Sequence, residues 1–384
     1  METIEFIRQH ANDDVRQLAL QGDKYPEVDM KFALQQIAGR QKARTKLPSW
    51  AAIDGIIYPP HLSMEQCSSE FTARYKAQIA GEGSLFVDLT AGFGVDAAWI
   101  SKGFRRAVTV ERQEQLCAIS SENFKLLGLN QIEVVCGDGE DYLHTMSRAD
   151  LIFIDPARRD EHGARTYGLA DCTPNVLELI GEMLEKADRI MMKLSPMLDW
   201  RKAVADVGHV NEVHIVSVDN ECKELILLAS RNEKPLRVIC VNDDEVFDFA
   251  PYDAAVVSPP PQAMPRYLYE PNASVMKAGC YDLLSERFGL AQLDRNSHLF
   301  VSDTDVPDFP GRCFVIDRTT SMNKRELKEA LSGIRQANIA VRNFPMSVAQ
   351  LRERLKLKDG GETYIFATKV ANQGLQLFVC RKKS

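Results

Sequence analysis

Short apolar runs alternate with amphipathic helical stretches from about residue 84 to residue 230. A run of four to eight apolar residues bounded by turn residues is typical of a buried strand. Strands that alternate with helices in this way favour parallel βαβ units and a doubly wound α/β sheet. The predicted strands are residues 85–87, 108–110, 132–136, 149–154 and 189–194.

The last two apolar runs of this region are residues 213–218 and 225–229, and only a short turn separates them. A connection this short makes two neighbouring strands antiparallel, whereas parallel strands need a long crossover. The sheet is therefore expected to end in a reversed strand.

Helical patterns come before this sheet. Residues 1–47 are mainly helical in pattern, and Ser63 with Gln66 forms an S-x-x-Q capping box that predicts a helix to about residue 79. Gln66, Ser68, Ser69 and Lys76 in that stretch are candidates for covering a bound ligand, although a plain surface helix would have the same pattern. Farther on, Thr173 and Pro174 predict another helix start, as a capping residue and a first-position proline.

Beyond Pro235 the pattern changes to smaller strand–helix–strand groups. Residues 236–250 alternate apolar and polar positions, and the prolines of 258–265 predict a stiff connector. Helices are expected near residues 274–288, 324–334 and 347–355, and strands near 299–301, 313–316, 340–342, 364–369 and 375–380, the last two joined by a hairpin turn.

These patterns divide the chain into four parts. They are an N-terminal helical region (1–80), an α/β domain (81–232), a connector with a small ferredoxin-like α+β domain (233–310) and a basic α+β domain (311–384). A chain of 384 residues with 45% hydrophobic content is long enough for several cores.

Composition narrows the setting. No run of about 18 apolar residues occurs, and residues 1–10 lack a signal-peptide profile. The nine cysteines show no metal-ligand spacing, which fits reduced, buried thiols. We therefore expect a cytoplasmic protein with no membrane span and no metal site.

Charge is distributed unevenly. Residues 324–384 hold thirteen Lys and Arg against five Asp and Glu, a balance of +8, which leaves −15 for the rest of the chain. Such asymmetry is typical of an enzyme whose nucleic-acid contacts lie in one module. The candidate phosphate contacts are Arg335, Arg342, Arg352, Arg354, Lys356 and Lys358, although for the charged run at 352–358 alone a solvated charged helix is the better explanation.

The sequence L-F-V-D-L-T-A-G-F-G at residues 85–94 predicts a ligand site. A strand ends at Asp88, and Gly92 and Gly94 follow in a tight loop before a helix. Glycine allows close approach of the backbone to a ligand, and a helix N-terminus favours electron-rich ligand atoms. Glu111 ends the next strand, 23 residues after Asp88, where a carboxylate can accept both ribose hydroxyls. This is a nucleoside-cofactor pattern.

Two cofactors compete for this pattern. Gly92, Gly94 and Ala97 also satisfy the G-x-G-x-x-G/A fingerprint of dinucleotide binding. Asp88, however, would repel a pyrophosphate and attract an amino group, and Asp138 ends the third strand, where it can accept from an adenine amine. The three acids thus favour S-adenosylmethionine (SAM).

The motifs D-L-T-A-G-F-G and V-T-V-E-R resemble those of the class I SAM-dependent methyltransferases, whose Rossmann-like sheet has a reversed last strand. The layout is also similar to a family of bacterial RNA methyltransferases with a THUMP-like C-terminal domain. That resemblance rests on residues 62–76, D-P-A-R-R at 155–159 and K-L-S-P-M-L-D at 193–199. It implies RNA binding by the C-terminal domain, and it implies a SAM site formed by Asp88, Thr90, Ala91, Gly92, Gly94, Glu111, Arg112, Asp138 and Gly139.

The exit of the fourth strand is the expected substrate side, because ligands bind beyond the carboxyl ends of strands in such sheets. Asp155, Pro156, Arg158 and Arg159 are the catalytic candidates, and Lys193 and Ser195 at the next strand end are substrate candidates. Amino-methyltransferases carry D/N-P-P-Y/F/W here, and this chain departs from that motif at Ala157 and Arg158. An arginine can stack on a base or clamp a phosphate, so RNA remains a suitable substrate. Tyr167 is a further candidate for stacking.

We therefore expect SAM-dependent methyl transfer to a nucleotide of a structured RNA. The alternatives are a small-molecule methyltransferase, an NAD-dependent oxidoreductase with a basic assembly tail, and an RNA-binding protein with a vestigial cofactor site. The intact glycine loop and its acids argue against the vestigial site, and no histidine at a strand end supports hydride transfer.

Overall fold

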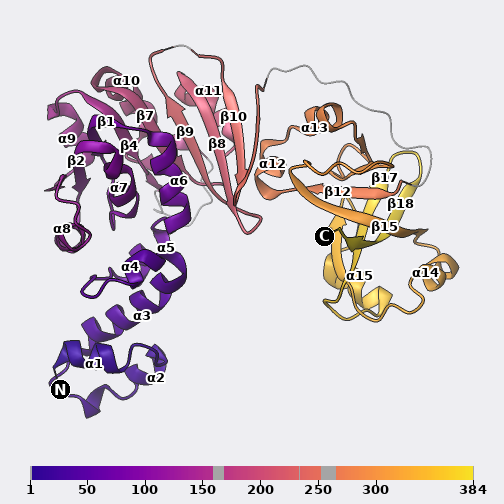
Figure 1. Cartoon of the computed structure of the whole chain (residues 1–384), viewed down its shortest axis with the longest axis horizontal. Coiled ribbons are helices and arrows are strands. Elements are labelled where there is room, and N and C mark those ends of the chain that lie inside the picture. The colour runs from indigo at the N-terminus through magenta and orange to yellow at the C-terminus, as the bar shows by residue number, and fades with distance from the viewer. Residues whose placement is uncertain (1, 159–167, 233, 252–264, 384) are drawn as a thin grey trace. The chain divides into compact units, whose positions relative to one another are not determined.

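The computed structural model describes residues 2–158, 168–232, 234–251 and 265–383. It divides into two compact units (Figure 1). The first unit comprises Met1–Val213 with Glu224–Pro235, and the second comprises His214–Lys223 with Leu236–Ser384. Each unit is described by itself.

The N-terminal region of the first unit is helical, as its pattern predicts. It contains α1 (Thr3–Gln9), α2 (Val15–Ala19), the 3-10 turn η1 (Gly22–Lys24), α3 (Met30–Lys46) and α4 (Pro48–Ala51). The Asp14 carboxylate caps α2, and the Asp29 carboxylate caps α3 by accepting from the Phe32 N–H. Phe6, Leu18 and Ile37 are buried together where these helices meet.

The single helix predicted from the Ser63 capping box is wrong. Two helices, α5 (His61–Gln66) and α6 (Glu70–Ala80), occupy this stretch, and Ser63 lies inside the first. The chain is extended at Cys67, and Ser69 caps α6 by accepting from the Thr72 N–H. The break therefore follows from a competing cap three residues beyond Gln66, and it allows Ser68 to turn inward.

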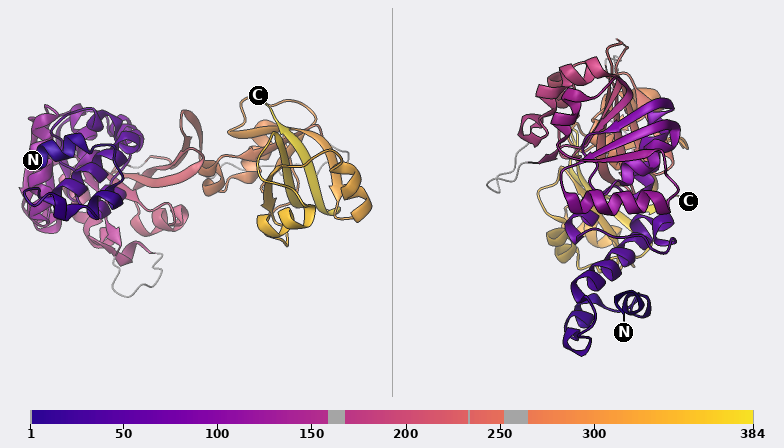
Figure 2. Two further views of the ribbon diagram at one scale, coloured as in Figure 1. Left: turned by 90° about the horizontal axis from the view of Figure 1, so that it is seen from below. Right: turned by 90° about the vertical axis from the view of Figure 1, so that its left-hand side faces the viewer.

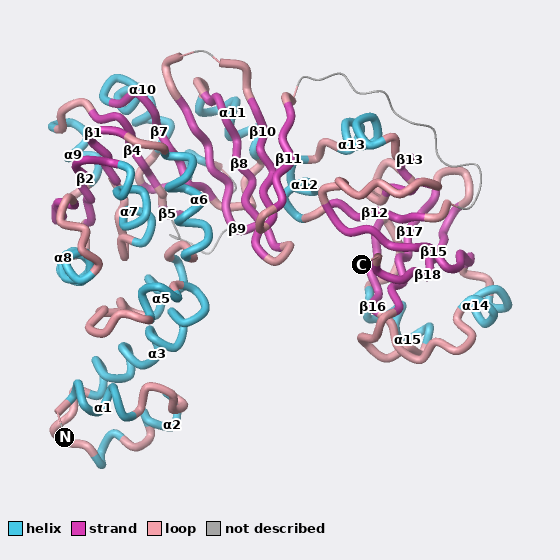
Figure 3. The backbone as a smooth tube through the Cα atoms, viewed as in Figure 1, coloured by secondary structure: helices cyan, strands magenta, loops and turns pink. Residues whose placement is uncertain are grey.

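A nine-stranded sheet contains the predicted strands (Figure 3). Its order is β11-β10-β8-β9-β7-β4-β1-β2-β3. The strands from β3 to β7 in this order are parallel, and β9 is antiparallel to β7, which confirms the reversed strand. The bounds are β1 (Gly83–Asp88), β2 (Phe104–Glu111), β3 (Ile132–Cys136), β4 (Ala149–Ile154), β7 (Ala187–Leu194), β8 (Val210–Val218), β9 (Glu221–Ala229), β10 (Arg237–Asn242) and β11 (Glu245–Phe249).

Helices connect the parallel strands. They are α7 (Val95–Ile100), α8 (Glu114–Leu126), α9 (Gly139–Thr145), α10 (Val176–Lys186) and α11 (Trp200–Val207), with 3-10 turns η2 (Ser101–Gly103) and η3 (Leu169–Asp171). A two-stranded ribbon, β5 (Ala157–Arg158) with β6 (Cys172–Thr173), follows β4. The helix start predicted at Thr173 is displaced, because Asn175 caps α10 by accepting from the Leu177 N–H.

The second unit contains one seven-stranded sheet, although the sequence suggested two separate α+β groups. Its order is β13-β14-β12-β15-β18-β17-β16. Pairing of β12 with β15 joins the two groups, and β15, β17 and β18 run side by side (Figure 2). The strands are β12 (Tyr267–Pro271), β13 (Ala291–Gln292), β14 (Phe300–Ser302), β15 (Gly311–Ser321), β16 (Asn338–Arg342), β17 (Thr363–Val370) and β18 (Gly374–Lys382).

The helices of this unit are α12 (Ala273–Ala278), α13 (Tyr281–Phe288), α14 (Lys324–Ala330) and α15 (Val348–Leu355). The helix predicted near 274–288 is split, since Gly279 takes a left-handed conformation with φ of 67° and ends α12. Ser347 and Gln350 form a complete capping box at the start of α15.

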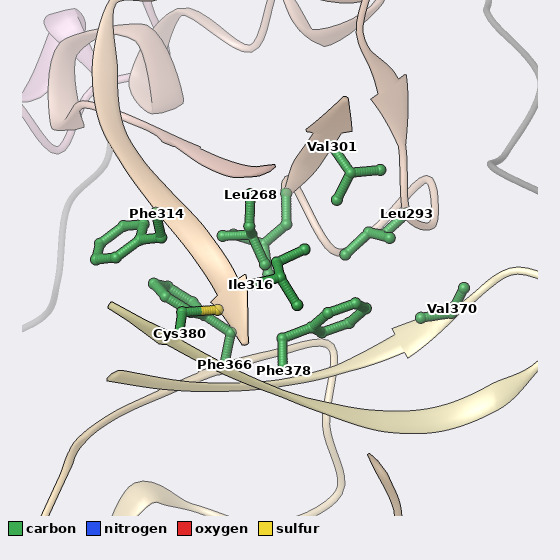
Figure 4. Close-up of a cluster of buried hydrophobic side chains, with 10 residues drawn as sticks. Leu268, Leu293, Val301, Phe314, Ile316, Phe366, Val370, Phe378 and Cys380 are labelled. Carbon is green, nitrogen blue, oxygen red and sulfur yellow. The ribbon is translucent and has the colours of Figure 1, made fainter. Parts of the chain in front are cut away.

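The second unit buries hydrophobic side chains on both faces of its sheet, and the cluster on one face links its two sequence groups. Phe314, Phe366 and Phe378 belong to one buried cluster with Leu268 and Ile316 (Figure 4). The Phe314 and Phe366 rings meet edge to face with centroids 4.7 Å apart. Because Leu268 belongs to β12 and the phenylalanines to later strands, this core holds both sequence groups together.

Replacing Phe366, which is 1% exposed, with alanine should lower the free energy of unfolding by about 3–5 kcal/mol. The loss combines the transfer free energy of the ring with the cavity that it leaves. Urea unfolding followed by circular dichroism measures it. The matched control is Val246→Thr in β11, at a side chain that is 62% exposed and should change stability by no more than about 0.5 kcal/mol. Equal effects of the two substitutions would contradict the assigned core.

Candidate active site

The glycine loop after β1 is tied to the strands on both sides. The Asp88 carboxylate accepts the Thr90 N–H at 2.9 Å, and the Ala91 N–H donates to the Val110 carbonyl of β2 at 2.9 Å. Asp88 is 1% exposed, and its burial raises the pKa of the carboxyl well above its ordinary value. The buried carboxylate of Asp88 thus holds the glycine loop in place.

The four glycines near this loop have two different functions. A Cβ on Gly94 would lie 2.6 Å from the Phe124 ring, and one on Gly139 would lie 2.2 Å from the Leu89 carbonyl oxygen, so these two glycines allow close packing. A Cβ on Gly92 or Gly137 would meet no atom within 4 Å. Those two glycines therefore border open space that a ligand can fill.

Glu111 closes the loop from β2. Its Oε2 accepts the Gly92 N–H at 2.9 Å, and its Oε1 accepts the Gln113 N–H at 2.8 Å. The side chain is half-buried. Each oxygen keeps one further lone pair, so the carboxylate can accept hydroxyl groups while it orders the loop.

Asp138 lies at the end of β3, one strand farther along. It caps α9 by accepting the Glu140 N–H at 2.8 Å, and its other oxygen lies 3.6 Å from the Arg112 guanidinium. Asp88, Glu111 and Asp138 therefore follow three adjacent parallel strands, as expected from the sequence.

The exit of β4 is joined to the glycine loop. The Asp155 N–H donates to Thr90 Oγ1 at 2.7 Å, and the Asp155 carboxylate pairs with Lys193 Nζ at 2.6 Å. Ser195 follows at the end of β7, where its hydroxyl accepts the Met197 N–H at 3.3 Å in a turn. The Arg158 side chain, Arg159 and Tyr167 lie outside the described residues.

Asp155 belongs to a buried group of charged and polar residues that we call the strand-end cluster. Its members are Ser68, Lys76, Asp96, Asp155, Lys193 and Glu224. Lys76 is fully buried, lies 3.1 Å from Asp96 and donates to Glu224. The Ser68 hydroxyl lies 2.8 Å from Asp96 and 3.1 Å from Glu224. Five elements of the first unit thus converge on one site.

The ionisation of the cluster is shifted by burial and by its own charges. Burial alone would lower the pKa of Lys193, but Asp155, Asp96 and Glu224 raise it above its ordinary value. Burial raises the pKa of Asp155 above its ordinary value, although Lys193 opposes the shift. Burial would raise the pKa of Glu224, but Lys76 and Lys193 lower it below its ordinary value.

Sequence reasoning identified only part of this cluster. Ser68 and Lys76 were candidates for covering a ligand, and Lys193 and Asp155 for the substrate side, but Asp96 and Glu224 were missed. The available signal was an acid inside an otherwise apolar stretch, in V-D-A-A-W-I and in K-E-L-I-L-L. Charged residues are almost never fully buried unless they are paired.

The six basic candidates of the second unit fall into two groups. Arg342 and Arg312 both pair with Glu270, which is 2% exposed. Arg352 donates to the Ala337 carbonyl and pairs with Asp359. These partners hold Arg342 and Arg352 within the fold, whereas Arg335, Arg354, Lys356 and Lys358 are exposed.

The described residues contain no group of three or more His, Cys, Asp and Glu side chains arranged to hold a metal ion. Among them there is also no helix with the length and apolarity needed to cross a membrane.

Family comparisons match three stretches of the chain. Residues 267–310 match a ferredoxin-like domain, and residues 311–382 match a family described as THUMP domain-like. Residues 75–161, which include the glycine loop and Asp155, match the protein-L-isoaspartate(D-aspartate) O-methyltransferases.

Whole-chain comparisons agree. A crystal structure of a candidate methyltransferase from Porphyromonas gingivalis W83 is 31% identical, with 100% of this chain and 98% of that chain covered and a TM-score of 0.88. Two uncharacterized SAM-dependent methyltransferases, from two strains of Mycobacterium tuberculosis, are each 25% identical over 330 residues, or 83% of this chain and 87% of theirs. The chain belongs to this family of SAM-dependent methyltransferases, with a Rossmann-like sheet followed by ferredoxin-like and THUMP-like parts.

Proposed function

We propose that this methyltransferase transfers a methyl group from SAM to a nucleotide of a structured RNA. The observation that carries the proposal is that one chain combines a methyltransferase sheet with a THUMP-like domain that exposes four cationic side chains. Cations of this kind neutralise backbone phosphates, which supply most of the affinity for a nucleic acid.

The residues around the glycine loop fit SAM. The open space beside Gly92 and Gly137 is a cradle that a Cβ would enter, and it lies between the ends of β1, β2 and β3. Glu111 would accept the ribose hydroxyls, and Asp138 with Gly139 and Arg112 would face the adenine. Thr90, Ala91, Gly92 and Gly94 would surround the methionine part, with Asp88 placed for its ammonium group.

Bound SAM supplies a methyl group whose bond to a positively charged sulfur breaks, with the electron pair left on sulfur, as the acceptor's lone pair bonds to carbon. The protein mostly has to align the acceptor, and such orientation can lower a barrier by about 7–11 kcal/mol. Asp155 accepts an N–H of the acceptor base and takes up its proton. Pro156 restricts the chain after Asp155, and Arg158 and Arg159 follow as candidate contacts to a base or phosphate.

The RNA side of the proposal rests on the second unit. Arg335, Arg354, Lys356 and Lys358 are the leading phosphate contacts because they are exposed. Arg342 and Arg352 would add to the local positive field from their paired positions. Lys193 and Ser195 remain substrate-side candidates of the first unit.

Mass spectrometry of nucleosides from RNA of a deletion strain tests the function. One methylated nucleoside should disappear, and it should return with the wild-type gene but not with an Asp155→Asn variant. The purified enzyme with SAM should then restore that mark in RNA from the deletion strain. An unchanged set of RNA nucleosides would contradict the proposal and favour a small-molecule acceptor.

Glu111→Ala should weaken SAM binding by about 1.5–3 kcal/mol for each charge-assisted hydrogen bond that it removes. The effect also includes the Gly92 N–H that this carboxylate orders. Titration calorimetry with SAM and with its demethylated product measures it. Glu114→Ala, at an exposed position in the first turn of α8, is the control and should bind normally. Unchanged affinity in Glu111→Ala would remove Glu111 from the cofactor site.

Asp155→Asn should reduce turnover by at least about 100-fold, the usual lower bound for a general base, and leave SAM affinity within a few-fold. The amide keeps the shape of the side chain but takes up no proton. Single-turnover kinetics and calorimetry separate the two effects. Full activity in this variant would mean that Asp155 and Pro156 only turn the chain.

Replacing Arg335, Arg354, Lys356 and Lys358 together with glutamine should weaken RNA binding and flatten its salt dependence. For every phosphate that is no longer neutralised, the log–log slope should decrease in magnitude by roughly 0.7–0.9. Filter binding at several salt concentrations measures it. Substitution is preferable to truncation at Arg312, because β15 pairs with β12 in the same sheet.

The control for this variant removes the same charge from the first unit, at the exposed residues Arg105, Lys125, Arg148 and Lys202. It should retain RNA affinity. Equal losses in the two variants would mean that net charge, rather than the THUMP-like surface, attracts the RNA.

A further inference from the structure

Lys193 is the central cation of the strand-end cluster. Its Nζ lies 2.6 Å from the Asp155 carboxylate and 3.9 Å from that of Asp96, and its side chain is only 12% exposed. A lysine this deeply buried keeps its charge only if acids surround it, because burial by itself favours the neutral amine.

The other members of the cluster contact one another. Lys76 contacts both Asp96 and Glu224, and the Ser68 hydroxyl lies between the same two acids. Asp155 differs from them, since Lys193 is the cation that pairs with it within the described part of the chain. Asp155 is also the acid nearest to solvent, with 36% of its side chain exposed, against 10% for Asp96 and 6% for Glu224.

We infer that Lys193 is a positioning residue for methyl transfer, which keeps the Asp155 carboxylate ionised and oriented toward the acceptor. Asp96, Glu224, Lys76 and Ser68 in turn hold Lys193 at this place. The inference rests on the proposed function of Asp155, and it adds that residues of α6, α7 and β9 act on the reaction through one ammonium group.

Two contacts orient Asp155. Its N–H donates to Thr90 Oγ1 in the cofactor loop, and its Oδ2 lies against Lys193 Nζ. The ion pair fixes one carboxylate oxygen, and Oδ1, which has no hydrogen-bond partner among the described residues, can accept from an acceptor group. The acceptor base is therefore presented with a carboxylate oxygen that can accept one of its N–H groups.

Charged groups of several elements act on this pair. Asp96 and Glu224 raise the pKa of both Asp155 and Lys193. Burial lowers the pKa of Lys46 and raises that of Cys67, and the charge of Lys193 adds to the first shift and opposes the second. Burial raises the pKa of Asp88, and Asp155 adds to that shift. Every acid near Asp155 therefore favours its protonated form, and Lys193 opposes them.

The sign of the pH effect follows from these contacts. Asp155 must be ionised to take up a proton, so activity should fall as the pH drops through the pKa of Asp155. Without Lys193 the burial and the neighbouring acids remain, so the pKa of Asp155 should rise further. An opposite charge at this distance typically shifts a carboxyl pKa by about one to three units.

The test is the pH profile of kcat for methyl transfer to RNA by wild type, Lys193→Gln and Lys193→Arg. In Lys193→Gln the acid limb should move to higher pH by about one to three units, so that activity lost at neutral pH partly returns in alkali. Lys193→Arg should restore the limb, and the KM for SAM should change little. Lys202→Gln, at an exposed lysine paired with Asp206, is the matched control and should follow wild type.

A uniform loss of kcat with an unmoved acid limb would overturn the inference, since a purely structural lysine would give that result. So would a limb that stays displaced in a folded Lys193→Arg variant. Movement of the limb together with rescue by arginine would support it.

A second measurement needs no RNA and separates this inference from the proposed function. Lys193→Gln should unfold at lower urea concentration than wild type at neutral pH, and the deficit should shrink as acid protonates Asp155. Asp155→Asn added to Lys193→Gln should recover much of the loss, because it removes the unpaired buried charge. No recovery in the double variant would overturn the pairing, whereas recovery without any RNA methylation by wild type would overturn only the substrate.

Discussion

Burial of charge at the carboxyl edge of the sheet is the constraint on which the first unit depends. Lys76, Lys193, Asp96, Glu224 and Asp155 lie together there, and removing water from any one of them alone would cost several kcal/mol. Pairing makes the group tolerable, and it requires α6, α7, β4, β7 and β9 to meet in one arrangement. The extended backbone at Cys67, which separates α5 from α6, belongs to the same arrangement because it places Ser68 in the strand-end cluster.

Hydrogen bonds join the glycine loop to the strand-end cluster. Thr90 contacts Asp88 through its backbone and Asp155 through its hydroxyl, so one residue links the end of β1 to the end of β4. Glu111 adds a second tie by holding the Gly92 N–H. The glycine loop is thereby kept in place by contacts from the ends of three strands, which is how a rigid sheet positions a loop.

The second unit exposes several cations on its surface and keeps a buried apolar core. Its sheet runs continuously from the ferredoxin-like part into the THUMP-like part, and the buried Phe314 and Phe366 of the THUMP-like part share one core cluster with Leu268 of the ferredoxin-like part. The buried carboxylate of Glu270 pairs with both Arg312 and Arg342, whose side chains stay partly exposed. Arg354, Lys356 and Lys358 lie at the end of α15 and beyond it, where they remain exposed and favourably placed near the negative end of the helix dipole.

The sequence by itself determined the order of strands and helices, the reversed strand β9 and the three acids at successive strand ends. These features depend on local apolar runs, glycines and short turns, which act through nearest neighbours along the chain. The competing local caps Ser69 and Asn175 set the starts of α6 and α10, whereas tertiary structure alone decided that two α+β groups share one sheet. It also decided the partners of Lys193 and of Arg342, because a charged side chain has the same letter in the sequence whether it faces water or a buried acid. Folding brings Asp96 and Glu224 next to Lys76, and the resulting ion pairs allow these three charges to be buried.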